Sequence, residues 1–87
     1  MSEESVIEFP CEFPLKMMGR DTPEFRDTMR TIVEKHVGEI DDSRVQAAVS
    51  RNGSFVSVTI TITATSQQQL DDIYGEVSAR DDVLMAL

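Results

Sequence analysis

The chain has 87 residues, enough for one domain, and a formal net charge of −8 from 16 acidic and 8 basic residues. This acidity disfavours nucleic-acid binding, which draws much of its affinity from Lys and Arg that neutralise phosphates. Hydrophobic residues make up 40% of the chain, enough for a core, and no apolar run approaches the ~20 residues of a membrane helix. We therefore expect one soluble domain with neither a nucleic-acid nor a membrane partner.

The first ten residues, MSEESVIEFP, lack the basic start and the apolar run of a signal peptide. They predict an acidic, flexible N-terminal tail over residues 1–10, followed by a single domain over residues 11–87. The expected location is the bacterial cytoplasm. Cys11 is the only cysteine, so an internal disulfide is excluded, and we interpret this thiol as inert or partly buried.

The first strand is predicted from Phe13 to Met18, where apolar and polar side chains alternate. The alternation assigns Phe13, Leu15 and Met17 to one face, and Lys16 and Met18 to the other. A turn is then predicted at residues 19–22, within the stretch MMGRDTPEF.

The first helix is predicted to begin at Pro23, because Thr22 is a good N-cap and proline suits the first helical position. It is expected to end near Val37, with Gly38 as its C-terminal stop. Its apolar side chains recur at helical spacing and predict one buried stripe, formed by Phe25, Met29, Ile32, Val33 and Val37.

Two further strands are predicted at residues 43–50 and 54–65, and Asn52-Gly53 between them is a strong signal for a hairpin turn. On the earlier strand Val45, Ala47 and Val49 are predicted to face the core. On the later strand the core-facing residues are Val56, Val58, Ile60, Ile62 and Ala64.

A second helix is predicted at residues 66–80, since Ser66 and Gln69 form a capping box. Its buried stripe is Leu70, Ile73, Tyr74 and Val77, and a short last strand follows at residues 83–87. The order is β-α-β-β-α-β. Right-handed crossovers then give a ferredoxin-like α/β sandwich of the α+β class, with a four-stranded antiparallel sheet in the order 4-1-3-2 and both helices on one face.

The sheet face without helices is the first candidate functional region. The predicted register gives it Lys16, Met18, Gln46, Ala48, Ser50, Phe55, Ser57, Thr59, Thr61, Thr63, Leu84 and Ala86. It is nearly uncharged and half apolar. It is either an ordinary solvated face or a docking face for a second copy or another protein, with Met18, Phe55, Ser57, Thr59, Thr61 and Leu84 as contacts.

The second candidate region is the corner at Gly19, Arg20, Asp21 and Thr22, where an arginine near a helix N-terminus could hold an anion. A lone Gly19-Arg20 does not supply the glycine-rich cradle of acylphosphatases, which share this fold. The first loop also lacks the Cys-x-x-Cys of metallochaperones. His36 is expected near a helix C-terminus in a surface or capping role. We predict no enzyme activity, no metal and no cofactor.

Four motifs resemble the YbeD family of small, uncharacterised bacterial proteins: EFPCEFPLKMMG, then a helix with VEKH, then NGSFVSVTITITATSQQQLDDIYGEV, and finally DDVLMAL. The resemblance covers residues 8–87. It implies the same fold and a similarity to ACT domains, the amino-acid-sensing regulatory modules of metabolic enzymes. Family genes often neighbour lipoate-biosynthesis genes. No catalytic residues are established for the family.

ACT domains bind an amino acid between the first loop and a neighbouring subunit, through an Asp-x-Pro-Gly-like stretch that opens the first helix. Asp21, Thr22 and Pro23 match this stretch, but Glu24 stands in place of the glycine. A glycine permits close approach of a ligand to the backbone, whereas Glu24 adds bulk and negative charge. Binding of an amino acid in the ACT manner is therefore disfavoured.

These observations predict a non-enzymatic regulatory or protein-interaction module, linked to lipoate or amino-acid metabolism. It would dock to itself as a homodimer or to a metabolic enzyme. The alternative is a small-ligand sensor, which would bind an amino acid or organic anion effector at the corner formed by residues 19–22.

Overall fold

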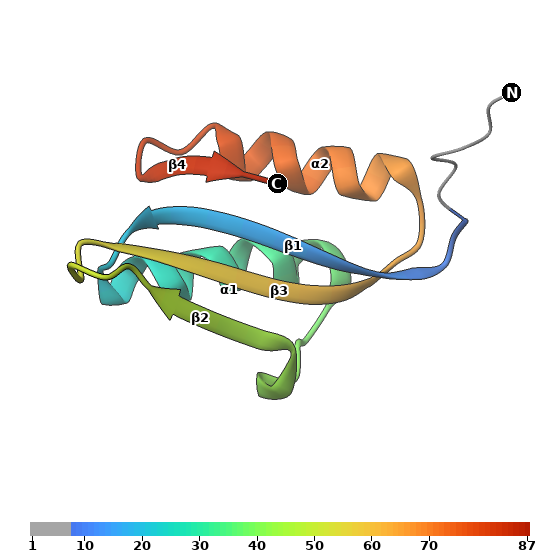
Figure 1. Ribbon diagram of the computed structural model, residues 1–87. Helices are drawn as coiled ribbons and strands as arrows, with labels where there is room; N and C mark the ends of the chain where they lie inside the picture. The colour runs from blue at the N-terminus through green and yellow to red at the C-terminus, as the bar shows by residue number, and fades with distance from the viewer. Residues whose placement is uncertain (1–7) are drawn as a thin grey trace, which may run out of the picture.

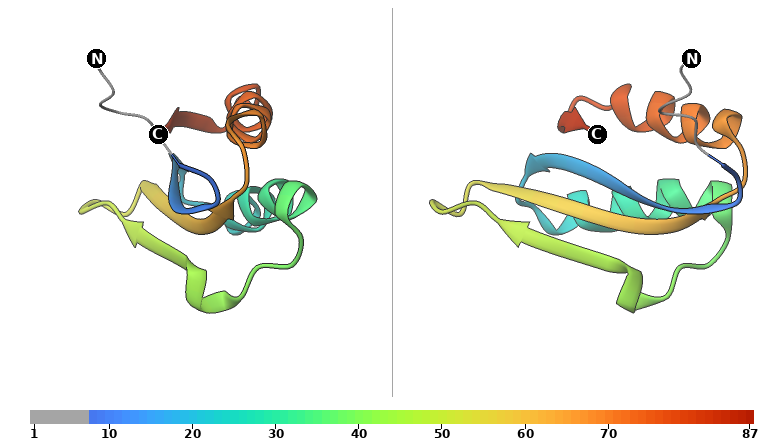
Figure 2. Two further views of the ribbon diagram at one scale, coloured as in Figure 1. Left: turned by 90° about the vertical axis from the view of Figure 1, so that its right-hand side faces the viewer. Right: turned by 45° about the vertical axis from the view of Figure 1, so that its right-hand side comes forward.

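The computed structural model describes residues 8–87 and contains one sheet and two α-helices (Figure 1). The elements are β1 (Cys11–Arg20), α1 (Pro23–Val37), the 3-10 helix η1 (Asp42–Arg44), β2 (Val45–Val49), β3 (Phe55–Ala64), α2 (Gln67–Ser78) and β4 (Val83–Ala86). The strands are antiparallel in the order β2-β3-β1-β4, and both helices lie on one side of the sheet (Figure 2). The predicted ferredoxin-like fold and strand order are confirmed.

The core fills the space between the sheet and the two helices. Its buried side chains come from β1, α1, β3 and α2, and they include the predicted Leu15, Met17, Phe25, Ile60 and Leu70. Residues 1–7 of the predicted tail lie outside the described residues. Phe9, also assigned to that tail, is partly buried against the core, so the packed part of the chain begins before residue 11.

Strand β1 is longer than predicted at both ends. Its pairing with β3 continues to Gly19 opposite Val56 and to Arg20 opposite Phe55, so the prediction that Gly19 and Arg20 lie in a turn is wrong. Gly19 is buried, and a Cβ atom there would lie 2.4 Å from the Asp82 carbonyl oxygen and 2.4 Å from the Phe25 ring. The glycine therefore permits close packing inside the sheet.

Pro14 lies within β1 although proline cannot donate a ladder hydrogen bond. The main-chain N–H of Lys16 donates to the carbonyl oxygen of Leu87, on the side of the strand that faces β4. Alternation places the nitrogen of Pro14 on this same side, but beyond the end of β4. The proline is tolerated because no strand within residues 8–87 pairs with β1 on that side at this point, the situation of an edge strand.

Both predicted helix N-caps are present. Thr22 Oγ1 accepts a hydrogen bond from Phe25 N, and Ser66 Oγ accepts one from Gln69 N, both at 3.1 Å. Gln69 Oε1 accepts from Thr65 N at 2.9 Å, one residue earlier than a capping box requires. Its amide nitrogen donates to the His36 carbonyl oxygen at 3.2 Å, so the same side chain joins the two helices.

The end of α1 leads into a connection that the sequence did not identify as structured. Gly38 ends the helix with a φ of 87°, as predicted. Ile40, in the connection after this helix, is only 4% exposed. Its main-chain N–H donates to Glu34 Oε2 at 3.0 Å, and its carbonyl oxygen accepts from the guanidinium of Arg30. Two charged side chains of α1 thus hold an apolar residue in the core.

Strand β2 is shorter than predicted, and the helices cover little of it. Val45, Ala47 and Val49 pair with the core residues Ile60, Val58 and Val56, so all three lie on the predicted side of the sheet. Val45 packs partly against the core, but Ala47 is exposed and Val49 is 49% exposed, so the last two lie on the core side without being buried. The physical reason is position. The strand is at one edge of the sheet, and residues 46–49 extend beyond the cover of the helices.

The register of β4 also differs from the prediction. Ala86 pairs with Met17 and packs against the core, whereas Met85 pairs with Met18 and belongs to the uncovered face. The predicted assignment of Ala86 to the uncovered face is wrong because an irregularity shifts the pairing between Met18 and Gly19. Leu84 lies at this irregularity and is 58% exposed.

Candidate interaction surface

The sheet face opposite the helices is open along β1 and β3. Residues paired across strands share a face, so the register assigns the side chains directly. The uncovered face carries Met18 opposite Ser57, Lys16 opposite Thr59 and Pro14 opposite Thr61, with Gln46 and Ala48 contributed by β2. The longer β1 adds two charged residues that the sequence did not assign to it, Glu12 and Arg20. The expectation of a nearly uncharged face is therefore wrong.

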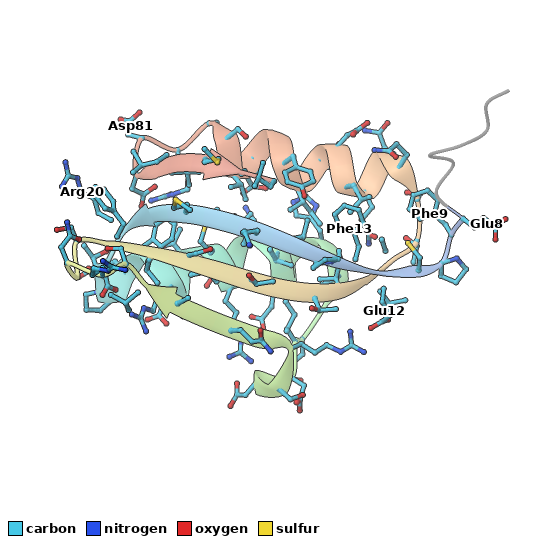
Figure 3. The ribbon with its side chains drawn as sticks, viewed as in Figure 1. Glu8, Phe9, Glu12, Phe13, Arg20 and Asp81 are labelled. Atoms are coloured by element: carbon cyan, nitrogen blue, oxygen red, sulfur yellow. The ribbon has the colours of Figure 1, made fainter. Side chains whose placement is uncertain are left out.

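Arg20 is directed along this face and not toward the N-terminus of α1. Its guanidinium lies over the Phe55 ring, 5.9 Å from the ring centroid, in a cation–π contact. Figure 3 shows Arg20 at the end of β1 that adjoins the β2–β3 hairpin, with Glu12 toward the other end. The predicted contact residue Phe55 is thus partnered by a cation of the same face.

A shallow groove crosses the uncovered face beside Phe55. The small cross-strand pair Ala48 and Ser57 forms its floor. One end is an apolar hollow of about 230 Å³, and the other is a more polar hollow of about 170 Å³ that reaches Lys16. The apolar hollow is lined by Met18, Ala48, Val49, Ser50, Phe55, Val56 and Ser57. Both volumes lie below the roughly 300–1,000 Å³ of typical small-molecule pockets, so the groove suits a side chain of a partner better than a whole ligand.

At the Glu12 end of this face, the polar side chains already form hydrogen bonds with one another. Thr63 Oγ1 donates to Glu12 Oε2 at 2.7 Å, and Arg44 pairs with the same carboxylate. Hydrogen bonds from Thr63 and then Arg44 hold the pKa of the Glu12 carboxyl below its ordinary value. These polar groups are already satisfied, so the open part of the face is the half between Lys16 and Arg20.

The four residues of the predicted ligand corner do not converge on one site. Gly19 is buried in the sheet, Arg20 covers Phe55, and Thr22 caps α1. Asp21 accepts a hydrogen bond from Arg26 at 2.8 Å. The depression at this corner is lined by Asp21, Pro23, Arg26 and Asp27, so its two carboxylates face a single arginine that is already paired. An anion would be repelled there, and the sensor function stays a prediction without a supporting pocket.

The residues considered for catalysis are far apart. Arg20 precedes α1, and His36 is near its C-terminus, about 20 Å away at the helical rise. His36 Nε2 lies 3.0 Å from Glu76 Oε1, and Lys35 pairs with Oε2 of the same carboxylate. Hydrogen bonds from Lys35 and His36 hold the pKa of the Glu76 carboxyl below its ordinary value. Among residues 8–87 no group of His, Cys, Asp and Glu side chains is arranged to hold a metal ion.

The fold and its uncovered face define a two-layer ferredoxin-like α+β domain. The chain belongs to the family described as "Protein of unknown function (DUF493)", whose model matches residues 4–87. This confirms the resemblance to the YbeD family of bacterial proteins. No helix within residues 8–87 is long and apolar enough to cross a membrane.

The matches to relatives cover nearly the full chain. A UPF0250 protein of Paraburkholderia phytofirmans is 44% identical over 84 residues, which cover 97% of this chain and 94% of the relative. A UPF0250 protein of Nitrosomonas europaea is 41% identical over 87 residues, with both chains fully covered. The solution structure of protein HP0495 from H. pylori matches with a TM-score of 0.76 at 18% identity, covers 99% of this chain and 90% of its own, and supports the fold.

Proposed function

We propose that this protein is a non-enzymatic regulatory module that acts by docking its uncovered sheet face onto another protein. The observation that carries the proposal is the open half of this face, where Met18, Phe55 and Met85 leave apolar surface beside a groove. A sheet normally buries each apolar face against another element, and no helix or strand within residues 8–87 covers the second face. A metabolic enzyme is the partner class we propose, in line with the resemblance to ACT domains and the lipoate-gene neighbourhood.

Site-specific photo-cross-linking in the native bacterium tests this function. A photoreactive amino acid replaces Ser57, at the centre of the groove, and in a control variant it replaces Asp72, which is exposed on α2. We expect a discrete cross-linked protein from position 57 and none from position 72. Identification of the adduct by mass spectrometry then names the partner.

Two results would contradict the proposal. The first is the same adduct pattern from both positions, which would show nonspecific capture. The second is the absence of any adduct from position 57 while the variant remains folded by circular dichroism. A small-ligand function at the corner would instead be indicated by thermal stabilisation with an amino or organic acid that an Arg26→Gln variant loses.

A further inference from the structure

The basic side chains of this molecule differ in whether they form salt bridges. Of the eight Lys and Arg residues, five form salt bridges, namely Arg26, Arg30, Lys35, Arg44 and Arg80. Within residues 8–87 the other three, Lys16, Arg20 and Arg51, have no carboxylate partner. In a chain with a net charge of −8, cations without a carboxylate partner in the described part of the chain stand out, because acidic groups to pair with are plentiful.

These three cations, which have no carboxylate partner among residues 8–87, lie at the two ends of the groove, with Lys16 lining its polar end and Arg20 and Arg51 near its Phe55 end. Lys16 and Arg20 lie on the uncovered face of β1, with Met18 between them, and Arg51 is exposed in the β2–β3 hairpin at the Arg20 end. Four residues along a strand place Lys16 and Arg20 roughly 13 Å apart. The exposed acidic side chains of the helices, such as Glu24, Asp27, Asp71 and Asp72, are on the opposite side of the sheet. The groove is therefore a cationic and apolar strip on an acidic protein.

This charge distribution argues against a second copy as the occupant. In a two-fold symmetric dimer the same patch meets itself, so Lys16, Arg20 and Arg51 of each copy would face the same cations. Like charges brought together at an interface are unfavourable. The homodimer expected from the sequence is thus disfavoured at this face, and a partner of opposite charge is favoured.

We propose that the groove binds an acidic amphipathic helix of a partner protein. The apolar hollow at Phe55 receives an apolar side chain, and carboxylates on either side of it pair with Lys16 and with Arg20 or Arg51. A separation of roughly 13 Å corresponds to about nine residues of helix, and the nearest positions that share one helix face are seven or eight apart. The two acidic residues therefore stand seven or eight positions apart with the apolar residue midway. The inference rests on the proposed docking function and specifies the chemistry of its partner.

A nucleic acid is the other anion that this fold could hold on the same face. RNA-binding domains of this architecture stack bases on aromatic side chains of the two central strands, but here Phe55 is the one aromatic on the open half of the face. Phe55 is already covered by Arg20, and the net charge of −8 repels a polyanion. An acidic helix presents far fewer charges and adds apolar contact.

The test is selection from a random peptide library displayed on phage, with the intact chain immobilised. Peptides of about 16 residues are long enough to form a helix on the protein. We expect enriched sequences to carry paired Glu or Asp with Leu, Ile, Met or Phe between them. The Lys16→Glu/Arg20→Glu variant should enrich basic peptides instead and bind the acidic ones about tenfold more weakly. Arg26→Glu/Lys35→Glu, an equal charge change on the helix side, should keep wild-type affinity within about twofold.

Amide chemical shifts then locate the bound peptide. Titration should shift Ala48, Ser57 and Thr59, and the affinity should fall as salt is added. The inference is overturned if neutral or basic peptides are enriched on the wild-type chain, or if the helix-side control weakens binding equally. A single-stranded oligouridylate that binds the same residues more tightly would also overturn it.

The chain's own acidic N-terminus is a competing occupant. A variant without residues 2–7 should keep its shifts at Ser57 and Thr59, and a change there would assign the groove to that segment and overturn the inference. The two proposals fail separately. Cross-links from position 57 without any acidic preference would refute only the partner chemistry. A lack of cross-links would refute the docking function itself.

Discussion

At Gly19 of β1, Phe25 of α1 and Asp82 of the segment before β4 both approach the strand closely. The atoms that a side chain at this position would meet are the Phe25 ring, buried in the core, and the main-chain oxygen of Asp82. Neither can move away easily, because the ring is packed on all sides and the carbonyl belongs to the backbone. A single hydrogen in place of a methyl group lets the helix pack against the strand.

Replacement of Gly19 by alanine should therefore destabilise the protein. Overpacking of a filled core costs roughly 1–3 kcal/mol, and we expect Gly19→Ala to lower the free energy of unfolding by about this amount. Chemical denaturation followed by circular dichroism measures the change. Gly75→Ala is the matched control, because a Cβ there meets nothing within 4 Å and alanine is the better helix former.

The control should move the other way, with a gain of about 0.5–1 kcal/mol. A wild-type value for Gly19→Ala would contradict the packing argument. The sequence alone could not distinguish these two glycines in this way. It placed Gly19 in a turn ahead of the helix that begins at Pro23, whereas the close approach of Asp82 depends on a contact between residues far apart in the chain.

Elements whose ends depend on local sequence signals were predicted well. Elements whose ends or faces depend on pairing with neighbouring strands were predicted less well. Thr22, Pro23 and Gly38 act on the helix that contains or adjoins them, so both ends of α1 could be predicted. The end of β1 depends on how far β3 continues beside it, and the face of Ala86 depends on the register irregularity in β4. Because a shift of one residue moves a side chain to the opposite face, the candidate surface was predicted only in part.

The two helices are joined to each other by Glu76 of α2, which contacts Lys35 and His36 of α1. The pKa of Glu76 is lower in the folded protein than its ordinary value, chiefly through the hydrogen bond from Lys35. A carboxyl whose folded pKa is depressed stabilises the protein above its unfolded pKa and loses this contribution as the pH falls through the folded pKa. The stabilisation should therefore be present at neutral pH and be lost below about pH 4.5.

A Glu76→Gln variant tests this contact between elements. It should be less stable than the wild type at pH 7, and the difference should shrink as the pH falls from about 5 to about 3. Urea denaturation at several pH values measures it. Asp71→Asn, on the same helix but without a contact to α1, should show no such convergence. A constant gap between Glu76→Gln and the wild type at every pH would contradict the prediction.

For the whole molecule, the separation of charge between the two sides is the main property. The net charge could be read from the sequence, and it predicted a poor nucleic-acid binder. The placement of Lys16, Arg20 and Arg51 near one groove could not be read from the sequence, because Arg20 was assigned to a turn and Arg51 lies outside any strand. That these three cations have no carboxylate partner within residues 8–87 became apparent only when the salt bridges of the other five basic residues were known.

The same excess of acidic groups should make the folded state sensitive to salt. Self-repulsion destabilises a compact acidic protein, and ions screen it, whereas exposed ion pairs contribute little and lose only that little when screened. We therefore expect the thermal unfolding midpoint to rise by a few degrees between about 0.02 and 0.5 M NaCl, which corresponds to about 1 kcal/mol or less for a domain of this size. The Asp27→Asn/Glu39→Gln variant changes the net charge from −8 to −6 at two exposed residues that have no ion-pair partner among residues 8–87, and its response should be smaller. A midpoint that falls with added salt would show instead that the ion pairs outweigh the repulsion.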